Sequence, residues 1–218
     1  MAAAAGAARP FVLVLAGVNG AGKSSVGGAL LAEHGLAWYN PDSYARELVG
    51  QLGLEVEDAN GRAWEHGRAQ LAAAIDGRRN HAFETTLGAS TIPGLLAQAA
   101  RSHDVVMIFC GLATAEMHLR RVQARVAAGG HDIPAGKIRE RWTRSRMNLI
   151  RLMPLLARLQ VFDNSAEAAP GEAIPDPVLL LEMSGGRLVF PAADEAAALA
   201  ATPDWARPIL QAAIEQQG

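Results

Sequence analysis

The segment from Gly17 to Ser24 has the residue types and spacing that most clearly indicate chemistry. It reads Gly17-Val-Asn-Gly-Ala-Gly-Lys-Ser and matches the phosphate-loop pattern G-x-x-x-x-G-K-[ST] at every fixed position. The glycines let successive backbone N–H groups point at phosphate oxygens, Lys23 can reach the β- and γ-phosphates, and Ser24 can hold Mg²⁺. The pattern predicts binding of ATP and Mg²⁺. The predicted nucleotide-binding residues are Gly17, Asn19, Gly20, Ala21, Gly22, Lys23, Ser24 and Ser25.

Two acidic residues follow short apolar segments further along the chain. Asp42 comes after residues 36–39, and Glu84 ends the segment that begins at His81. The carboxyl ends of parallel strands meet at the ligand-binding edge of a sheet, so we expect both carboxylates there. Asp42 can accept the proton of an attacking hydroxyl, or it can cap the next helix. Glu84 can bind Mg²⁺ together with Ser24, or it can be an exposed glutamate at the strand end.

Arginines gather between residues 120 and 151. Arg121 and Arg125 are four residues apart, so they share one face of a predicted helix that runs into the glycine pair 129–130, which we interpret as a flexible lid. On the next predicted helix, a basic arc lies apart from the apolar stripe. The arc consists of Arg141, Arg144, Asn148 and Arg151. Such a cluster suits a transferring phosphoryl group, although any single arginine could instead form an ordinary ion pair.

Within this cluster, we assign catalysis to Arg121, Arg125 and Arg141, beside Lys23 and Asp42. Substrate binding is assigned to Asp42, Glu84, Thr85, Thr86, Arg144 and Arg151. The two threonines could equally serve only to favour a strand. Asn164, after the last predicted parallel strand, is a candidate for contacting adenine, with a simple turn as the alternative. His131 in the lid could touch substrate or stabilise its own loop.

These side chains must be positioned by alternating strands and helices. Short apolar runs predict five parallel strands, at residues 11–16, 36–39, 81–86, 104–110 and 159–162. Helical patterns lie at 23–34, 43–52, 61–75, 90–101, 114–128, 135–156 and 203–216. A hairpin is expected around Ser184-Gly-Gly. The pattern predicts an α/β P-loop NTPase, a nucleotide-kinase-like three-layer sandwich with a mainly parallel five-stranded sheet, an arginine-bearing lid and a small C-terminal hairpin.

Composition limits the classes of protein that fit. The chain has 218 residues, half of them apolar, and a net charge of -2, so one domain over residues 1–218 is expected, without a nucleic-acid partner. Residues 166–218 would be appended to that domain, and residues 1–10 would be disordered. The single cysteine, Cys110, fits a reducing cytoplasm and a buried strand thiol. No apolar stretch approaches membrane-spanning length, so we expect no membrane association.

Several motifs together resemble the zeta-toxin family of P-loop kinases, especially its small bacterial members. The matching segments are Gly17-Val-Asn-Gly-Ala-Gly-Lys-Ser-Ser, Asn40-Pro-Asp, Phe83-Glu-Thr-Thr-Leu, Arg121-Val-Gln-Ala-Arg, Gly129-Gly-His-Asp-Ile-Pro, Arg141-Trp-Thr-Arg-Ser-Arg and Phe162-Asp-Asn-Ser. Their order and spacing cover residues 11–165. The resemblance favours Asp42 as the base and Thr86 as a substrate contact.

The resemblance implies transfer of the γ-phosphate of ATP to a small-molecule hydroxyl, with the 3′-hydroxyl of UDP-N-acetylglucosamine as the leading acceptor. It also implies an antitoxin protein as a partner. Two alternatives stay open at this point. One is a kinase for another hydroxylated molecule, such as an antibiotic or a nucleoside. The other is a non-catalytic ATP-binding regulatory protein.

Overall fold

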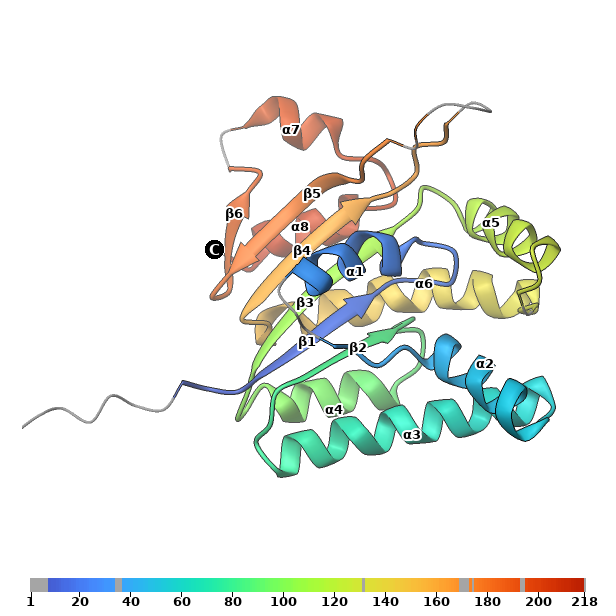
Figure 1. Ribbon diagram of the computed structural model, residues 1–218. Coiled ribbons are helices and arrows are strands. Elements are labelled where there is room, and N and C mark those ends of the chain that lie inside the picture. The colour runs from blue at the N-terminus through green and yellow to red at the C-terminus, as the bar shows by residue number, and fades with distance from the viewer. Residues whose placement is uncertain are drawn as a thin grey trace, which may run out of the picture.

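A six-stranded sheet in the order β2-β1-β3-β4-β5-β6 forms the centre of the protein (Figure 1). The computed structural model describes residues 8–33, 37–130, 132–168, 173, 175–192 and 195–217. The strands are β1 (Phe11–Ala16), β2 (His81–Thr85), β3 (Asp104–Gly111), β4 (Arg158–Asp163), β5 (Val178–Ser184) and β6 (Arg187–Phe190). Strands β1 to β4 run parallel, and β5 and β6 are antiparallel to their neighbours. The predicted α/β P-loop NTPase fold is confirmed.

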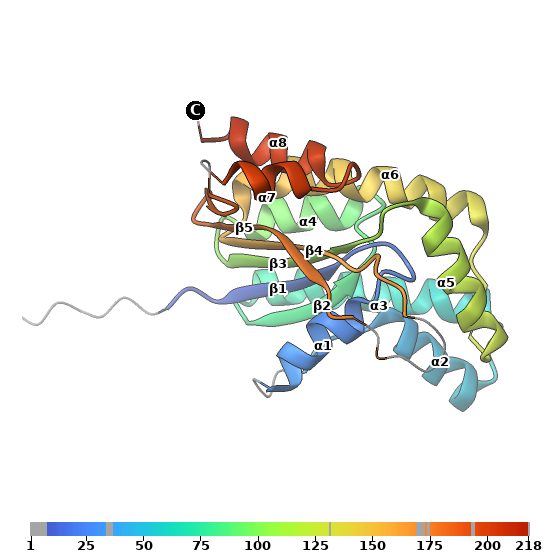
Figure 2. The same ribbon diagram turned by 90° about the horizontal axis from the view of Figure 1, so that it is seen from above.

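Helices cover both faces of this sheet. They are α1 (Lys23–Glu33), α2 (Pro41–Leu52), α3 (Val56–Asp76), α4 (Thr91–Ala99), α5 (Ala115–Ala127), α6 (Ala135–Leu152), the short 3₁₀ helix η1 (Met153–Leu155), α7 (Ala196–Ala201) and α8 (Arg207–Glu215). Figure 2 shows α1 on one face and α4, α6 and α8 on the other. None of the described helices is both long and apolar enough to cross a membrane.

Side-chain alternation along the central strands fills two cores at once. In β3, Met107 and Phe109 join the large core beneath α4, α6 and α8, whereas Ile108 and Cys110 join the smaller core beneath α1. Successive residues of a strand point to opposite faces, so a strand covered on both faces must be apolar throughout. This requirement explains why the central strands read as continuous apolar runs.

The predicted strand at residues 36–39 is wrong as a strand. Leu36 lies outside the described residues, and of the rest only Tyr39 forms a bridge, with Phe83 of β2. The N–H of Tyr39 donates to the carbonyl of Ala82 (2.9 Å), and the carbonyl of Tyr39 accepts from the N–H of Glu84 (2.9 Å). Pairing stops there because Asn40 caps α2 and Pro41, which has no N–H, is the first helical residue.

The C-terminal hairpin is part of the central sheet. Its first strand, β5, pairs with β4, so the hairpin extends the main sheet to six strands instead of five. The predicted turn is confirmed, since Gly185 and Gly186 both have positive φ (56° and 75°), as a two-residue hairpin loop favours. That residues 1–218 form a single domain stays a prediction.

Several helices differ from their predicted bounds, and α3 differs most. Helix α3 begins at Val56, five residues before the predicted start at Gly61, because Ala59 and Ala63 pack against α2. This packing outweighs the cost of placing Gly61 inside the helix, because glycine is about 1 kcal/mol less favourable there than alanine. The prediction missed α7, a six-residue segment made only of alanine and leucine.

Within the segment that the sequence predicts to be disordered, Arg9 packs against the end of the sheet. Arg9 forms an ion pair with Asp104 (2.9 Å) and donates to the carbonyl of His103 (3.0 Å). Residues 1–7, Gly35 and the lid residue His131 lie outside the described residues.

The last residue of β3 packs against the C-terminal segment. A Cβ atom added at Gly111 would lie 2.2 Å from a ring carbon of Trp205, whose side chain is buried. The rings of Trp205 and Phe109 have centroids 6.5 Å apart. Glycine at this position therefore lets the tryptophan close the core over the end of the sheet.

We predict that Gly111→Ala destabilises the fold by about 1–3 kcal/mol, because the methyl group overpacks the Trp205 contact. Gly94→Ala in α4 is the matched control, since its Cβ would meet no atom within 4 Å. That change should stabilise the fold by about 0.5–1 kcal/mol through helix propensity. Urea unfolding measures both effects, and equal stabilities of the two variants would contradict the packing argument.

Candidate active site

The phosphate loop connects the end of β1 to the start of α1, as the sequence predicts. Gly17 has φ 139°, and a Cβ there would lie 2.2 Å from the carbonyl oxygen of Cys110, so only glycine fits. Its N–H donates to the carbonyl of Thr85 at the end of β2 (3.2 Å). The loop is therefore held between the carboxyl ends of β2 and β3.

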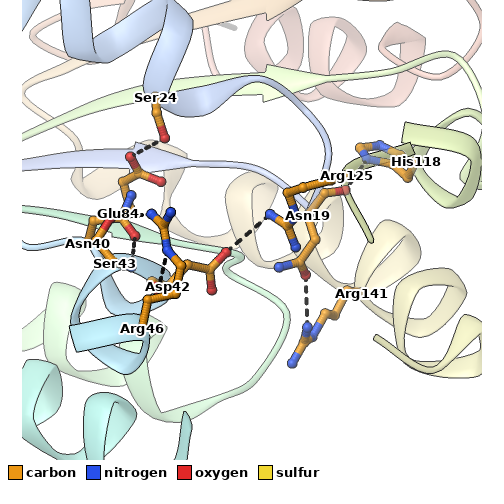
Figure 3. A network of polar contacts seen from close by, with 10 residues as sticks. All are labelled: Asn19, Ser24, Asn40, Asp42, Ser43, Arg46, Glu84, His118, Arg125 and Arg141. Atoms are coloured by element: carbon orange, nitrogen blue, oxygen red, sulfur yellow. Dashed lines mark hydrogen bonds and ion pairs between the residues drawn. The ribbon is translucent and has the colours of Figure 1, made fainter. Parts of the chain in front are cut away.

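Side chains from three other elements hold the outer side of the loop. The Asn164 amide donates to the carbonyl of Ala21 (2.9 Å), and Nδ1 of His118 lies 2.9 Å from the carbonyl oxygen of Asn19. Arg141 of α6 donates to Oδ1 of the Asn19 side chain (2.8 Å; Figure 3). Asn164 uses its amide to support the loop, and its predicted contact with adenine stays a prediction.

The predicted metal-binding residues lie side by side. The Ser24 hydroxyl donates to Oε1 of Glu84 (2.8 Å; Figure 3). The indole N–H of Trp38 donates to the same oxygen (3.1 Å). Glu84 is buried, so the alternative of an exposed glutamate is wrong. Two adjacent oxygen ligands suit Mg²⁺, which prefers oxygen and takes few ligands from the protein. Among the described residues, no cluster of three His, Cys, Asp or Glu side chains could hold a metal ion.

Asp42 does not cap α2, because Asn40 does. The Asn40 side chain accepts from the N–H of Ser43 (3.1 Å). The Asp42 carboxylate points instead toward Arg125 of α5, with Oδ2 and Nη1 separated by 3.4 Å (Figure 3). Both side chains are about 40% exposed (40% and 39%), so the ion pair contributes at most about 1 kcal/mol. A pair this weak can be exchanged for a ligand.

The lid arginines that share one helix face contact different parts of the site. Nε and Nη2 of Arg125 are buried and have no hydrogen-bond partner among the described residues, so both donors are unpaired. Arg121 donates to the backbone carbonyls of Asn164 (2.8 Å) and Ala166 (3.2 Å). Arg121 therefore holds the segment after β4, whereas Arg125 faces the acceptor side.

The basic arc of α6 does not act as one cluster. Burial lowers the pKa of the Arg141 guanidinium, an effect that the nearby Asp42 carboxylate opposes. Arg144, in contrast, is exposed and pairs with Glu140 (2.6 Å). Arg151 is exposed and, ten residues after Arg141, lies about 15 Å further along the helix axis. Of this arc, only Arg141 contacts the phosphate loop.

The two candidate threonines hold the loop after β2. The hydroxyl oxygen of Thr85 accepts from the N–H of Leu87 (3.1 Å), and that of Thr86 accepts from the N–H of Gly88 (3.4 Å). These contacts favour a structural role, although each hydroxyl can still donate its proton elsewhere.

The loop after β2 also positions Arg141. The sequence analysis predicted Arg141 but not this role of the loop. Leu87 is buried with φ 55°, a strained conformation for leucine, and Asn148 of α6 donates to its carbonyl (2.8 Å). A Cβ at Gly88 would lie 2.6 Å from Cγ of Arg141. Glycine thus allows α6 to approach the loop. No local sequence signal marks Gly88, because its neighbour is 53 positions away in the chain.

An open hollow of about 550 Å³ adjoins Ser24 on the side of α2. The ring of Tyr44, one of its lining residues, stacks on His66 of α3, with centroids 4.6 Å apart. The lining is formed by Ser24, Ala37, Trp38, Tyr39, Asn40, Ser43, Tyr44, Arg46 and Glu47. The hollow offers aromatic, amide and charged groups to a ligand.

Burial shifts the pKa of two groups beneath the loop. Desolvation raises the pKa of the Cys110 thiol to about 12, which leaves it a neutral strand residue, as predicted. Desolvation also lowers the pKa of His118 from 6.5 to about 4, although its hydrogen bond to Asn19 opposes the shift. His118, which the sequence analysis did not single out, is therefore uncharged at neutral pH.

Comparison with known proteins agrees with this geometry. Residues 12–149, well over half of the 218 residues, match a family model described as an AAA domain (AAA_33). The chain belongs to this family. The matched segment of the AAA_33 domain runs from β1 to α6 and contains the phosphate loop, Asp42, Glu84 and the lid arginines. No curated protein is similar enough to count as a match.

Solved structures share the fold of this AAA_33 domain. The AvrRxo1-ORF1:AvrRxo1-ORF2 complex with ATP aligns at TM-score 0.63 and 14% identity, covering 95% of this chain and 64% of that one. The same complex with sulphate ions aligns at 0.62 and 16%, covering 88% and 62%. The PezAT toxin-antitoxin system of Streptococcus pneumoniae aligns at 0.51 and 16%, covering 71% and 67%. The chain thus spans less than two thirds of these two AvrRxo1 chains. The similarity establishes a P-loop kinase-like fold.

We predict that stability falls as the pH is lowered from 6.5 to about 4. The unfolded chain protonates His118 near pH 6.5, whereas the folded protein resists protonation down to about pH 4. Stability that is present above pH 6.5 is therefore lost across this range, on the order of 3 kcal/mol for this one group. His118→Asn should make the decline shallower in urea unfolding at a series of pH values. Exposed His66→Asn is the control, and identical pH slopes for wild type and His118→Asn would contradict the prediction.

Proposed function

We propose that this chain is a kinase that uses ATP and Mg²⁺ to phosphorylate a hydroxyl group of a small molecule. The observation that carries the proposal is the placement of Asp42. Its carboxylate is free of the helix cap, which Asn40 provides, and it faces Arg125, whose Nε and Nη2 are buried without a partner. A base and an anion-binding group are thereby adjacent, as phosphoryl transfer to a hydroxyl requires.

In the proposed reaction, Asp42 accepts the proton of the acceptor hydroxyl as its oxygen attacks the γ-phosphorus. The bond from that phosphorus to the β–γ bridging oxygen breaks, and ADP leaves. Arg125 exchanges its weak contact with Asp42 for the charge that develops on the transferred group. The exchange favours transfer, because it releases the base and supplies the cation in one movement.

The nucleotide side of the proposal is supported by the phosphate loop and by the contact between Ser24 and Glu84. Their adjacent oxygen atoms fit a Mg²⁺ ion that also binds phosphate oxygens. Mg²⁺ bound there would neutralise negative charge on the phosphates. Lys23, the first residue of α1, would bind the β- and γ-phosphates at the positive end of that helix.

For the acceptor, we propose UDP-N-acetylglucosamine first, with the sugar 3′-hydroxyl as the attacking group. The motif resemblance to zeta toxins motivates this choice, and the hollow beside Ser24 provides room lined by Arg46 and by aromatic rings. Because the similar PezAT protein is described as a toxin-antitoxin system, an antitoxin is the protein partner we propose. An antibiotic or a nucleoside is the alternative acceptor on the same scaffold.

A non-catalytic ATP-binding regulator is the rival from a different functional class. Simple nucleotide sensing would require the phosphate loop and the metal ligands. It would give no reason for a carboxylate to face a partly unpartnered arginine on the acceptor side. Turnover therefore separates the two functions.

The deciding measurement is mass spectrometry of reactions that contain ATP, Mg²⁺ and either UDP-N-acetylglucosamine or an uncharged acceptor. We expect a product that is heavier by one phosphate with the first compound, and none from Lys23→Ala. Asp42→Asn should lower kcat on the order of 100-fold or more while calorimetry gives near-normal ATP affinity, because the base lies on the acceptor side. Asp58→Asn, a change at an exposed carboxylate on α3, is the matched control.

The outcomes separate the levels of the proposal. If only the uncharged acceptor is phosphorylated, UDP-N-acetylglucosamine is rejected as the acceptor, and the proposal of a kinase is kept. ATP binding without transfer to any acceptor would favour the regulator. Full activity of Asp42→Asn would remove Asp42 as the base.

The two lid arginines should differ kinetically. Arg125→Ala should lower kcat on the order of a thousandfold with little change in KM for ATP, because in the proposed reaction its donors bind the transferred group. Arg121→Ala should mainly raise KM for ATP, since Arg121 holds the segment after β4. Arg139→Ala, which removes only an exposed ion pair with Glu116, is the control. Equal losses of kcat from both changes would restore the sequence-based prediction that they act together.

A further inference from the structure

His118 is a buried polar residue that the proposed reaction does not use. It lies on α5 and is only 1% exposed, yet its Nδ1 contacts the phosphate loop at the carbonyl oxygen of Asn19, 2.9 Å away. Burial lowers its pKa to about 4, so the ring is neutral at pH 7. A neutral ring this deeply buried is a poor ligand for a phosphate anion, and its role must lie in the contact that it makes.

The chemistry of that contact defines the state of the ring. A carbonyl oxygen can only accept, so Nδ1 carries the proton and donates it. In a trans peptide, the C=O and N–H groups of one plane point in opposite directions. The carbonyl of Asn19 belongs to the same plane as the N–H of Gly20. A donor on α5 that holds the carbonyl outward therefore turns the N–H of Gly20 away from α5.

The packing around Gly20 shows how closely this peptide is held. Gly20 has φ 81°, and a Cβ there would lie 3.0 Å from the carbonyl oxygen of His118 and 3.3 Å from Cβ of Arg121. Asn19, whose carbonyl His118 binds, also accepts from Arg141 through its side chain (2.8 Å). One buried histidine thus holds both a loop peptide and the residue on which Arg141 rests.

We infer that His118 is a positioning residue: by donating to the carbonyl of Asn19, it orients the Asn19–Gly20 peptide so that the N–H of Gly20 donates to a phosphate of the bound nucleotide. The inference rests on the proposed function, because it assigns a further donor to the same phosphates. The remaining N–H groups of the loop and Lys23 still bind the nucleotide without His118. Loss of His118 should therefore reduce transfer more than binding.

Two similar substitutions separate the hydrogen bond from general packing. His118→Asn places an amide nitrogen two bonds from Cβ, as Nδ1 is, whereas the amide of His118→Gln is one bond further out. Asparagine should restore the bond to Asn19 and keep kcat within a few-fold of wild type. Glutamine should lower kcat on the order of 10- to 100-fold with a smaller change in ATP affinity, because a small misplacement of a catalytic donor has an effect of this size. Circular dichroism and thermal unfolding check that both variants fold.

A second readout observes the peptide directly. In ¹⁵N-edited NMR, the Gly20 amide proton should move downfield when Mg²⁺ and a non-hydrolysable ATP analogue bind to wild type and to His118→Asn. The shift should shrink in His118→Gln. An unmoved Gly20 amide in wild type that binds the analogue would overturn the inference, even if His118→Gln does not fold. The inference also fails if His118→Gln keeps both the shift and kcat. A wild-type protein that binds no ATP analogue would instead overturn the proposed function.

Discussion

A phosphate loop that turns its N–H groups inward must turn carbonyl groups outward, and these need donors. In this protein, Asn164 supplies one to Ala21 and His118 supplies one to Asn19. A buried carbonyl without a donor would destabilise the loop by about 1–3 kcal/mol. The strands and helices around the loop therefore have to deliver these side chains from distant parts of the chain. The shape of the anion site depends on them as much as on the glycines.

On the acceptor side of the site, one residue stabilises helix α2 and a neighbouring residue is available for chemistry. Asn40 ends the short bridge at Tyr39 and caps α2, and a cap of this kind contributes about 1 kcal/mol. The carboxylate of Asp42, two residues later, makes a half-exposed contact with Arg125. The helix does not depend on that contact, so the carboxylate can be exchanged between an arginine and a substrate without loss of the fold.

The sequence predicted the site where its pattern was local. The phosphate-loop spacing and the strand ends correctly brought Ser24 and Glu84 together, because Ser24 lies just after β1 and Glu84 lies near the end of β2, which pairs with β1. Helical periodicity was less informative. It placed Arg141 and Arg151 on one arc, but a shared helix face does not show how far along the helix axis each residue lies from the phosphate loop. Similarly, Arg121 and Arg125 share a face, yet one binds backbone carbonyls and the other a carboxylate.

The sequence by itself determined most of the strands and helices along the chain, the phosphate loop and the apolar stripes, since each depends on residues within a few positions of one another. Only the tertiary structure decided which residues meet across long separations. Examples are Asp42 beside Arg125, Asn164 beneath the loop, and Gly88 against Arg141. Their hydrogen-bond donors and close approaches come from segments that are distant in the chain. Local periodicity carries no record of such contacts, which arise only when the whole sheet and its helices pack together.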